Sequence, residues 1–477
     1  MIATMKKLFG TDGMRGAAGS FPLDAATVRV AGRSLARHLT DETGRAPRIV
    51  AGRDTRESGA WIERAFLDGA LEAGAACESA GVITTPGVAF LARTLPADAG
   101  VVISASHNPY QDNGIKIFAP TGRKLDEATE RLIEADIYAE TEGARPVSNE
   151  GFEPETEAPG EVGTRTESVS ADAQDEQHAR ALRTRYLEYL VGTVAAGLRL
   201  DGLCVVVDCA NGAAFELAPA LFERLGARVV RLHASPDGRN INRDCGSLHI
   251  EGLRQRVSEE KADIGVAFDG DADRSLFVDA RGTFVDGDAT MWALGKRMSE
   301  RGELEGGTVV ATVMSNIGLE LALRSRGVEL LRTDVGDKYV LEELLRTGAV
   351  LGGEQSGHII FPRLSLAGDG MLTAIQLLRV MRETGAALHE LTAGFERYPQ
   401  VLTNVRVREK LPFEEVEEIA RCARETEAKL GGRGRLLLRY SGTEPLARVM
   451  IEGERQDEIE ALASALASVI RDNLGAG

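Results

Sequence analysis

The sequence predicts an α/β protein built from three tandem α/β domains with mixed sheets and a smaller C-terminal α+β domain. Three observations lead to this fold class. The chain has 477 residues, more than the roughly 250 to 300 residues at which one hydrophobic core stops growing. Short apolar runs alternate with amphipathic helical stretches over most of the chain. Near residue 400 this order of strands and helices changes.

The predicted strands are short apolar runs that end in glycine-rich or polar turns. They lie at residues 48–53, 100–104, 203–208, 263–268, 308–313 and 349–353. Helical spacing of apolar residues predicts helices between them, at residues 25–38, 61–73, 217–225, 317–324 and 341–346. This alternation favours parallel or mixed sheets that are covered on both faces. Ligands of such sheets bind beyond the carboxyl ends of the strands.

We predict domains at residues 1–175, 176–283, 284–395 and 396–477. The last domain is expected to contain strands at 401–407, 435–440 and 447–453 and helices at 413–430 and 458–474. Residues 141–177 are rich in Glu, Gly, Pro, Ser and Thr. They hold few large apolar side chains and bury too little surface to offset the entropy of ordering. We therefore expect an exposed, mobile insertion where the first domain ends.

Composition excludes several classes of function. The formal net charge of -17 repels nucleic acid and acidic membranes at long range, so local positive loops must capture any anionic substrate. The five cysteines are scattered and lack the paired spacing of a zinc site or a disulfide framework, which predicts reduced, mostly buried thiols. We expect a cytoplasmic protein, because no apolar run reaches the roughly 18 to 20 residues of a membrane helix and the N-terminus lacks the apolar core of a signal peptide.

The first loop that carries reactive side chains is Ser104-Ala-Ser-His-Asn-Pro109, which directly follows a predicted strand. Two hydroxyls and an imidazole therefore emerge at a strand end. The spacing differs from the G-x-S-x-G elbow of hydrolases, and neighbours on an extended chain usually point apart. Taken alone, the loop fits an ordinary polar turn better than a catalytic site.

The second loop, Asp269-Gly-Asp-Ala-Asp-Arg274, carries three carboxylates at alternate positions. They converge on one hard cation if the backbone curls, which Gly270 permits. A calcium EF-hand loop fits poorly, because position six is Arg274 and position twelve is Ala280. Magnesium shared with a phosphate oxygen suits these ligands better, and a solvated acidic turn is the alternative.

Two further loops hold groups that suit a sugar phosphate. The stretch Gly353-Glu-Gln-Ser-Gly-His358 offers the donors and acceptors that sugar hydroxyls need. In Arg439-Tyr-Ser-Gly-Thr-Glu-Pro445, a guanidinium, two hydroxyls and glycine-freed backbone N–H groups can cradle a phosphate. Each loop by itself is also compatible with an ordinary turn.

The four loops occur in a fixed order after Phe9-Gly-Thr-Asp-Gly-Met-Arg-Gly16. Together they resemble the α-D-phosphohexomutase superfamily nearly end to end, and within it the bacterial phosphoglucosamine mutases. Supporting stretches are Asp208-Cys-Ala-Asn-Gly212, Val335-Gly-Asp-Lys338, Gly368-Asp-Gly370 and RYSGTEPLARVMIE at 439–452. The resemblance implies four domains around a central cleft, with one loop from each.

The resemblance also implies roles for individual residues. Ser106 would carry the phosphoryl group and also contact Mg²⁺, whose other ligands would be Asp269, Asp271 and Asp273. Glu354 and Ser356 would bind the sugar. The distal phosphate would be held by Arg439, Ser441, Gly442 and Thr443. Further active-site positions would be Arg15, His107, Lys116, Arg274 and Lys338, with His107 and Lys116 as candidates for general acid or base.

The implied reaction interconverts glucosamine 6-phosphate and glucosamine 1-phosphate through phosphorylated Ser106 and a sugar bisphosphate, which is both activator and intermediate. Such a reaction feeds amino-sugar nucleotide and cell-wall precursor synthesis. Two alternatives stay open: a phosphoglucomutase or phosphomannomutase on the same scaffold, and a non-catalytic sugar-phosphate binding protein. The expected partner is the hexosamine phosphate alone, without nucleic acid or membrane. The oligomeric state is left open, with a homodimer as one option.

Overall fold

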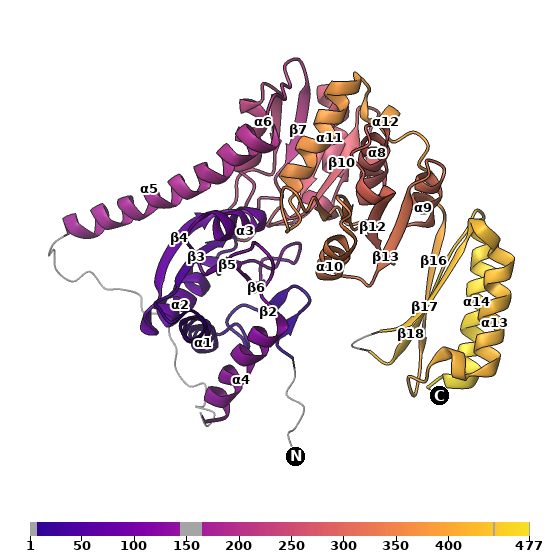
Figure 1. The fold of residues 1–477 in the computed structure, drawn as a ribbon, viewed down its shortest axis with the longest axis horizontal. Helices are drawn as coiled ribbons and strands as arrows, with labels where there is room; N and C mark the ends of the chain where they lie inside the picture. The colour runs from indigo at the N-terminus through magenta and orange to yellow at the C-terminus, as the bar shows by residue number, and fades with distance from the viewer. Residues whose placement is uncertain (1–6, 144–164, 442–443, 477) are drawn as a thin grey trace.

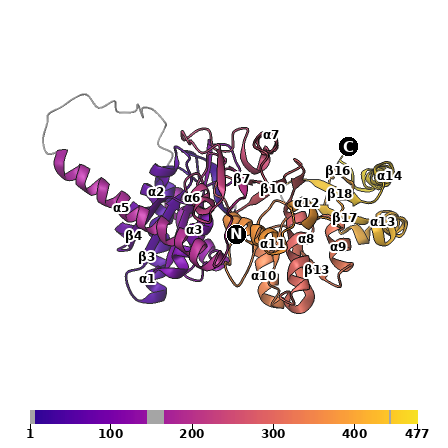
Figure 2. The same cartoon turned by 90° about the horizontal axis from the view of Figure 1, so that it is seen from above.

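The computed structural model describes residues 7–143, 165–441 and 444–476, and these form four sheets that follow one another along the chain (Figure 1). We refer to the regions around the sheets as domains I to IV. Seen from above, domains I and IV lie at opposite ends of an elongated molecule (Figure 2). Within the described ranges, no helix combines the length and the apolarity needed to cross a membrane.

Domain I contains a six-stranded mixed sheet in the order β1-β2-β6-β5-β3-β4. β3 pairs in parallel with β4 and β5, whereas β6 pairs antiparallel with β5 and β2. The elements are β1 (Phe9–Gly10), β2 (Gly13–Ala17), α1 (Ala25–Thr43), β3 (Arg48–Arg53), α2 (Gly59–Glu72), β4 (Ala76–Val82), α3 (Thr85–Thr94), β5 (Ala99–Ile103), β6 (Asp112–Phe118) and α4 (Glu127–Gly143).

Domain II contains a five-stranded sheet in the order β11-β10-β9-β7-β8, again with parallel and antiparallel pairs. Its long entry helix α5 extends along domain I (Figure 1). The elements are α5 (Arg165–Tyr189), the π-helix η1 (Leu190–Val194), β7 (Cys204–Asp208), α6 (Leu217–Arg224), β8 (Arg228–Leu232), the 3₁₀ turn η2 (Gly246–Leu248), α7 (Glu251–Glu260), β9 (Ile264–Phe268), β10 (Ser275–Asp279) and β11 (Phe284–Val285).

Domain III contains a four-stranded mixed sheet in the order β13-β12-β14-β15. The expected strand at 349–353 pairs only at Gly352 and Gly353, where it meets β12 and β15. The elements are α8 (Gly287–Glu300), the 3₁₀ turn η3 (Glu305–Gly307), β12 (Thr308–Thr312), α9 (Ile317–Arg324), β13 (Glu329–Thr333), α10 (Asp337–Thr347), β14 (Gly352–Gly353), β15 (Ile359–Ile360), α11 (Gly370–Thr384) and α12 (Leu388–Leu391).

Domain IV is a three-stranded antiparallel sheet in the order β16-β18-β17, with α13 and α14 on one face (Figure 1). The helix expected at 413–430 is interrupted at Val416, whose backbone is extended. The elements are β16 (Gln400–Arg406), the 3₁₀ turn η4 (Phe413–Glu415), α13 (Glu417–Leu430), the 3₁₀ turn η5 (Gly431–Arg433), β17 (Arg435–Tyr440), β18 (Leu446–Glu452) and α14 (Gln456–Leu474).

Three α/β domains with mixed sheets and a C-terminal domain with an antiparallel sheet confirm the predicted fold class. Central strands β5, β7, β9 and β12 are buried throughout, as expected for strands with helices on both faces. Residues 144–164 of the expected insertion lie outside the described residues, and residues 165–177 form the first part of α5.

The hydrophobic cores show how the domains are joined. One cluster of buried residues runs through domains I, II and III, and includes Val50, Phe222 and Trp292. Domain IV has a separate core, and polar contacts attach it to domain III. The carboxylate of buried Glu452 accepts a hydrogen bond from Asn316 Nδ2 at 3.2 Å, and Arg435 Nη2 donates one to the Ser315 carbonyl oxygen at 3.1 Å. Domains I to III therefore share one hydrophobic core, and domain IV is attached to them through polar contacts.

Candidate active site

Ser106 follows the fully buried strand β5 and is itself buried. Its φ of 52° lies in the left-handed region, which costs energy for a residue other than glycine and is frequent at functional sites. The Ser104 hydroxyl accepts a hydrogen bond from the Ser106 N–H at 2.9 Å and donates one to Asp54 at 2.7 Å. These contacts hold the turn in the conformation that directs Ser106 Oγ toward domain II.

Two side chains far away in sequence hold the carbonyl groups of this loop. Arg56 donates from Nη2 to the carbonyl oxygens of Ser106 at 2.9 Å and Asn108 at 2.8 Å, and its Nε pairs with Asp54 at 2.8 Å. From domain II, Asn242 Nδ2 donates to the same two carbonyl oxygens at 2.8 and 3.0 Å. Because all these groups are buried or nearly so, the loop is held from both sides by satisfied polar contacts.

The three aspartates of the second loop lie directly opposite Ser106. All three are buried, and one carboxylate oxygen from each lies within 4.8 Å of the others. Ser106 Oγ donates to Asp269 Oδ2 at 2.6 Å. Burial, together with the charges of Asp273 and Asp271, raises the pKa of Asp269 well above its usual value. Asp271 Oδ1 and Asp273 Oδ1 have no hydrogen-bond partner within the described residues, so the triad fits a divalent cation that would satisfy these oxygens.

The loop curls at a different residue from the one expected. Gly270 does not have a positive φ; instead Ala272 lies in the left-handed region with φ 57°. Gly270 is required for space, because a Cβ there would come within 2.5 Å of the Ser106 carbonyl oxygen and 3.0 Å of Asn242 Nδ2. The glycine therefore allows the aspartate loop to pack directly against the serine loop.

Lys116, on β6, is the positively charged residue in closest contact with the aspartate triad. Its Nζ lies 2.9 Å from Asp271 Oδ2, 3.3 Å from Asp273 Oδ2 and 3.2 Å from Asp12 Oδ2. Burial alone would lower the pKa of Lys116, but the three carboxylates outweigh it and raise this pKa well above its usual value. The side chain is 1% exposed, so it is a buried positive charge that contacts two of the three candidate metal ligands.

His107 and Arg274 lie beside the Ser106 hydroxyl. His107 Nδ1 is 3.4 Å from Ser106 Oγ and 3.3 Å from Arg274 Nη1. Burial lowers the pKa of His107, and the charges of Arg274 and Arg15 lower it further. Arg15, on β2, pairs with Asp12. The imidazole is therefore neutral at neutral pH, whereas Lys116 is charged.

The third loop contacts the second, because His358 Nδ1 lies 3.7 Å from Asp273 Oδ2. Glu354 accepts a hydrogen bond from Ser356 Oγ at 3.1 Å and one from Gly336 N at 3.2 Å. Lys338 pairs with Glu127 of α4 at 2.6 Å. A cavity of about 380 Å³ lies at the junction of domains I and III, and its lining includes Lys124, Asp273, Asp337, Lys338 and His358.

The fourth loop is described only in part. Arg439 ends β17 together with Tyr440, and buried Ser441 follows; Gly442 and Thr443 lie outside the described residues. The Ser441 hydroxyl accepts from Glu444 N at 3.3 Å, and Arg448 Nη2 lies 3.4 Å from it. Within the described part of the chain, no hydrogen bond or ion pair joins Arg439 or Ser441 to the other three loops. The structure therefore brings three of the predicted loops together, whereas the described residues of the fourth make no polar contact with them.

Several residues of the site were missed from the sequence. Asp12 and Asp337 both pair with Lys124, at 2.6 and 2.8 Å. His358 lies 3.7 Å from carboxylate oxygens of Asp273 and Asp337, and although burial opposes it, the charge of Asp273 raises the pKa of His358 to about 9. Asp12, Asp337 and His358 lie inside motifs already singled out in the sequence, and this position was the signal that could have identified them. Other missed residues, such as Arg56, Asn242 and Lys124, lie outside those motifs.

This combination of domains and loops defines the class of phosphohexomutases. Models of the four domains of phosphoglucomutase/phosphomannomutase match residues 6–144 (α/β/α domain I), 184–282 (domain II), 286–398 (domain III) and 402–469 (the C-terminal domain). The chain therefore belongs to the phosphoglucomutase/phosphomannomutase family and is a phosphohexomutase, which confirms the resemblance seen in the sequence.

Relatives over the full length narrow the class further. The chain is 48% identical over 470 residues to a phosphoglucosamine mutase of Solibacter usitatus, with 98% of this chain and 99% of that protein covered. It is 46% identical to a phosphoglucosamine mutase of Mycobacterium ulcerans, with 98% and 99% covered. A crystal structure of a phosphoglucomutase/phosphomannomutase family protein from Burkholderia thailandensis has a TM-score of 0.74 at 24% identity and covers 99% of this chain and 98% of that one.

Proposed function

We propose that this enzyme interconverts glucosamine 6-phosphate and glucosamine 1-phosphate, with Ser106 as the carrier of the phosphoryl group. The observation that carries the chemistry is the buried Ser106 hydroxyl, which donates to Asp269 of the aspartate triad. In this triad, Asp271 Oδ1 and Asp273 Oδ1 lack hydrogen-bond partners within the described residues. Full-length relatives that are phosphoglucosamine mutases support the choice of substrate. The reaction would supply amino-sugar nucleotide and cell-wall precursor synthesis.

The proposed reaction starts with a phosphoryl group on Ser106 Oγ. A hydroxyl oxygen of the bound sugar phosphate forms a bond to phosphorus while the bond from phosphorus to Oγ breaks. This leaves a sugar bisphosphate and a serine hydroxyl that has taken up a proton. The bisphosphate turns around, and its other phosphoryl group returns to Oγ by the same step in reverse. Transfer of this kind needs mainly positioning and positive charge beside the phosphoryl oxygens.

The side chains around Ser106 divide these tasks. Neutral His107, 3.4 Å from Oγ, can accept and return a proton. Lys116 stays charged because its carboxylate partners raise its pKa, so it serves as fixed positive charge together with Arg274. Arg15 supports the same region through Asp12. The proposal therefore favours His107 over Lys116 as the proton acceptor.

The candidate metal ligands are Asp269, Asp271 and Asp273, with Ser106 beside them. Their oxygen-only donor set and their orphaned buried oxygens suit Mg²⁺. When bound, this ion supplies positive charge next to the transferring phosphoryl group. The chain's own residues set the geometry, since Gly270 allows the aspartate loop to reach the serine loop.

The remaining predicted residues complete the proposal. Glu354 and Ser356 bind the sugar through the carboxylate and the hydroxyl, and Lys338 adds a positive charge to the lining of the cavity. The proposed distal phosphate site consists of Arg439, Ser441, Gly442 and Thr443. The predicted domain boundaries, a cytoplasmic location, a homodimer and the absence of nucleic-acid partners also stay predictions.

A coupled assay of glucosamine 6-phosphate, glucose 6-phosphate and mannose 6-phosphate tests the substrate. We expect glucosamine 6-phosphate to give the largest kcat/KM. The Ser106→Ala variant, prepared in the same way, controls for contaminating mutases. If a glucose or mannose phosphate exceeds the amino sugar by tenfold or more while Ser106→Ala stays inactive, the chemistry holds and the substrate assignment is wrong.

A further inference from the structure

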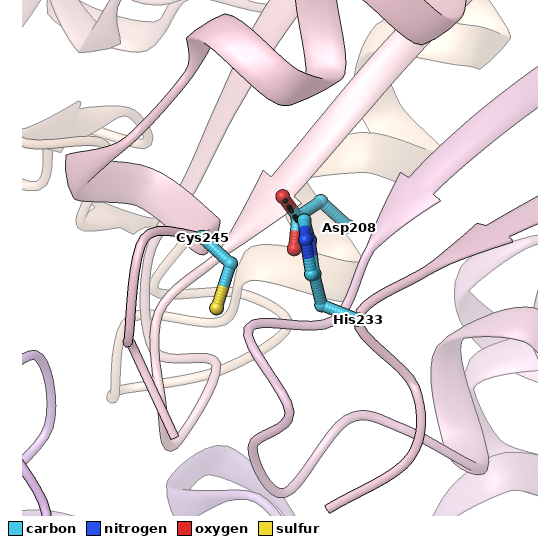
Figure 3. A group of neighbouring side chains, drawn as sticks. All are labelled: Asp208, His233 and Cys245. Atoms are coloured by element: carbon cyan, nitrogen blue, oxygen red, sulfur yellow. Dashed lines mark ion pairs between the residues drawn. The ribbon is translucent and has the colours of Figure 1, made fainter. Parts of the chain in front are cut away.

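A second group of potential metal ligands lies in domain II, outside the phosphoryl-transfer site. Asp208 ends β7, His233 follows the parallel strand β8, and Cys245 precedes η2. One ligand atom of each lies within 4.8 Å of the others. Figure 3 shows the three side chains approaching one another from three separate segments. Sequence spacing gave no sign of this group, because its members come together only through the sheet.

The aspartate and the histidine form a close ion pair (Figure 3). His233 Nδ1 is 3.0 Å from Asp208 Oδ2, yet this nitrogen is a buried atom without a hydrogen bond of acceptable geometry in the described structure. A cation bound beside this pair would coordinate the buried nitrogen.

The backbone around the group is built to hold it. Both Asp208 oxygens accept backbone N–H bonds, Oδ1 from Ala210 at 2.9 Å and Oδ2 from Gly246 at 3.1 Å. Such outer contacts orient a ligating carboxylate. His233 adopts a left-handed φ of 46°, a conformation that is costly for this residue and that needs support from its surroundings. Its side chain is 33% exposed, so an ion can enter from solvent.

Cys245 supplies the third ligand and determines the class of ion. It is 1% exposed, and its sulfur is only 4.0 Å from Asn211 Nδ2, a weak contact. A metal ion that binds this sulfur displaces the thiol proton. One carboxylate, one imidazole and one thiolate suit a borderline-soft transition metal and not Mg²⁺. Three protein ligands leave a fourth position for water.

We propose that Asp208, His233 and Cys245 form a second metal site, for Zn²⁺ or a transition-metal ion of similar chemistry, that is separate from the aspartate triad. Bound there, the ion ties the ends of β7 and β8 to the segment before η2. That segment also carries Asn242, which donates to the carbonyl oxygens of Ser106 and Asn108. In addition, Asn211, in the turn after β7, accepts a hydrogen bond from Thr55 of domain I at 2.5 Å. The metal site thus fixes the segments of domain II that contact the Ser106 loop and domain I.

Cobalt titration of the full chain, freed of metal and then saturated with Mg²⁺, tests the proposal. Co²⁺ bound to a thiolate absorbs in the near ultraviolet, whereas Co²⁺ bound to carboxylates alone does not, so the aspartate triad cannot give the signal. We expect one equivalent of Co²⁺ to produce this band and Zn²⁺ to abolish it by displacement. The Cys245→Ser variant should lose the band. Cys209→Ser, which removes a buried thiol outside the group, and Asp271→Asn, which alters the triad, should keep it.

A second measurement covers the case in which Cys245→Ser folds poorly. Zn²⁺ should raise the Tm of the parent protein in the presence of Mg²⁺, and His233→Gln, whose side chain is partly exposed, should weaken Zn²⁺ binding on the order of 10- to 100-fold or more. No thiolate band with the parent protein, or a band that survives in Cys245→Ser, overturns the proposal. If Zn²⁺ raises the Tm of His233→Gln as much as the Tm of the parent, the proposal is also wrong. Asp208 and His233 then form only an ordinary ion pair.

Discussion

The guanidinium of Arg56 donates a hydrogen bond to the main-chain carbonyl of Ser106 at 2.9 Å. The residue proposed to carry the phosphoryl group is therefore held through its backbone, which leaves its hydroxyl free to face Asp269. Asn242 donates to the same carbonyl oxygen from domain II. The position of the hydroxyl thus depends on two domains, although the serine belongs to one.

Removal of the Asn242 amide should slow turnover without much change in substrate binding. Asn242→Gly eliminates both hydrogen bonds and tolerates the φ of 59° found at this position. At about 1 kcal/mol for each bond, we expect kcat to fall on the order of tenfold while KM changes little. Asn240→Gly, in the adjacent exposed turn, is the matched control. Equal effects of the two substitutions on kcat would show that Asn242 has no positioning role.

Ser106→Ala should abolish turnover and phosphorylation of the enzyme, because the hydroxyl is the proposed nucleophile. Intact-mass measurement of phosphate on the protein and the coupled assay check this together. Ser104→Ala provides a control in the same loop, since Ser104 contacts Asp54 and the Ser106 N–H but not the aspartate triad. That variant should still be phosphorylated. Near-normal turnover by Ser106→Ala would refute the mechanism.

Chelation should remove activity, and added Mg²⁺ should restore it. Asp271→Asn should weaken both metal affinity and rate, because Asp271 Oδ1 is one of the unsatisfied oxygens of the triad. Asp279→Asn, a buried aspartate on β10 outside the triad, controls for loss of a buried carboxylate. Titration calorimetry with Mg²⁺ and the coupled assay provide the measurements. Full activity after exhaustive chelation would contradict the proposed role of the triad.

Arg439→Ala should impair the forward and reverse reactions alike, because one distal anchor must hold either phosphate after the bisphosphate turns. A charge-assisted hydrogen bond contributes roughly 1.5 to 3 kcal/mol, so kcat/KM should fall about tenfold or more in both directions. More bisphosphate should also escape, and it can be counted by chromatography. Arg433→Ala, at an exposed site in the same domain, is the control. Unchanged kinetics in both directions would remove the fourth loop from the site.

Asp369 should make stability depend on pH. Burial raises the pKa of Asp369 to about 6, against hydrogen bonds from Leu372 N–H and Tyr186 that lower it. The folded protein therefore keeps this proton to higher pH than the unfolded chain, whose group titrates near 3.8. The contribution is fully present below about pH 4 and is lost as pH rises through 6, with an amplitude of about 3 kcal/mol.

The Asp369→Asn variant keeps the N-cap of α11 but cannot titrate. The Tm of the parent should therefore fall relative to the Tm of the variant as pH rises from 4 to 6. Above pH 7 the difference between the two Tm values should stay constant. A difference that does not change with pH would show that Asp369 is ionised throughout that range in the folded state.

Much of the fold could be predicted from local sequence. The strands at 48–53 and 435–440 and the helix at 317–324 have the predicted bounds, because apolar periodicity reports directly which face of an element is buried. The strand at 349–353 was overestimated, because all five residues are buried but only Gly352 and Gly353 find partners across the sheet. Burial is visible in a sequence, whereas pairing depends on other segments.

The sequence by itself determined the class of protein and the loops at the strand ends, because the reactive side chains of each motif lie in one short contiguous run of residues. Only the tertiary structure decided which charges meet. It brings Lys116 against Asp12, Asp271 and Asp273, which keeps the lysine charged, and it buries His107 beside Arg274, which keeps the imidazole neutral. The group of Asp208, His233 and Cys245 likewise exists only in the fold. The physical reason is that electrostatic energies depend on distance and burial in space, and for residues far apart in the chain neither is written in the sequence.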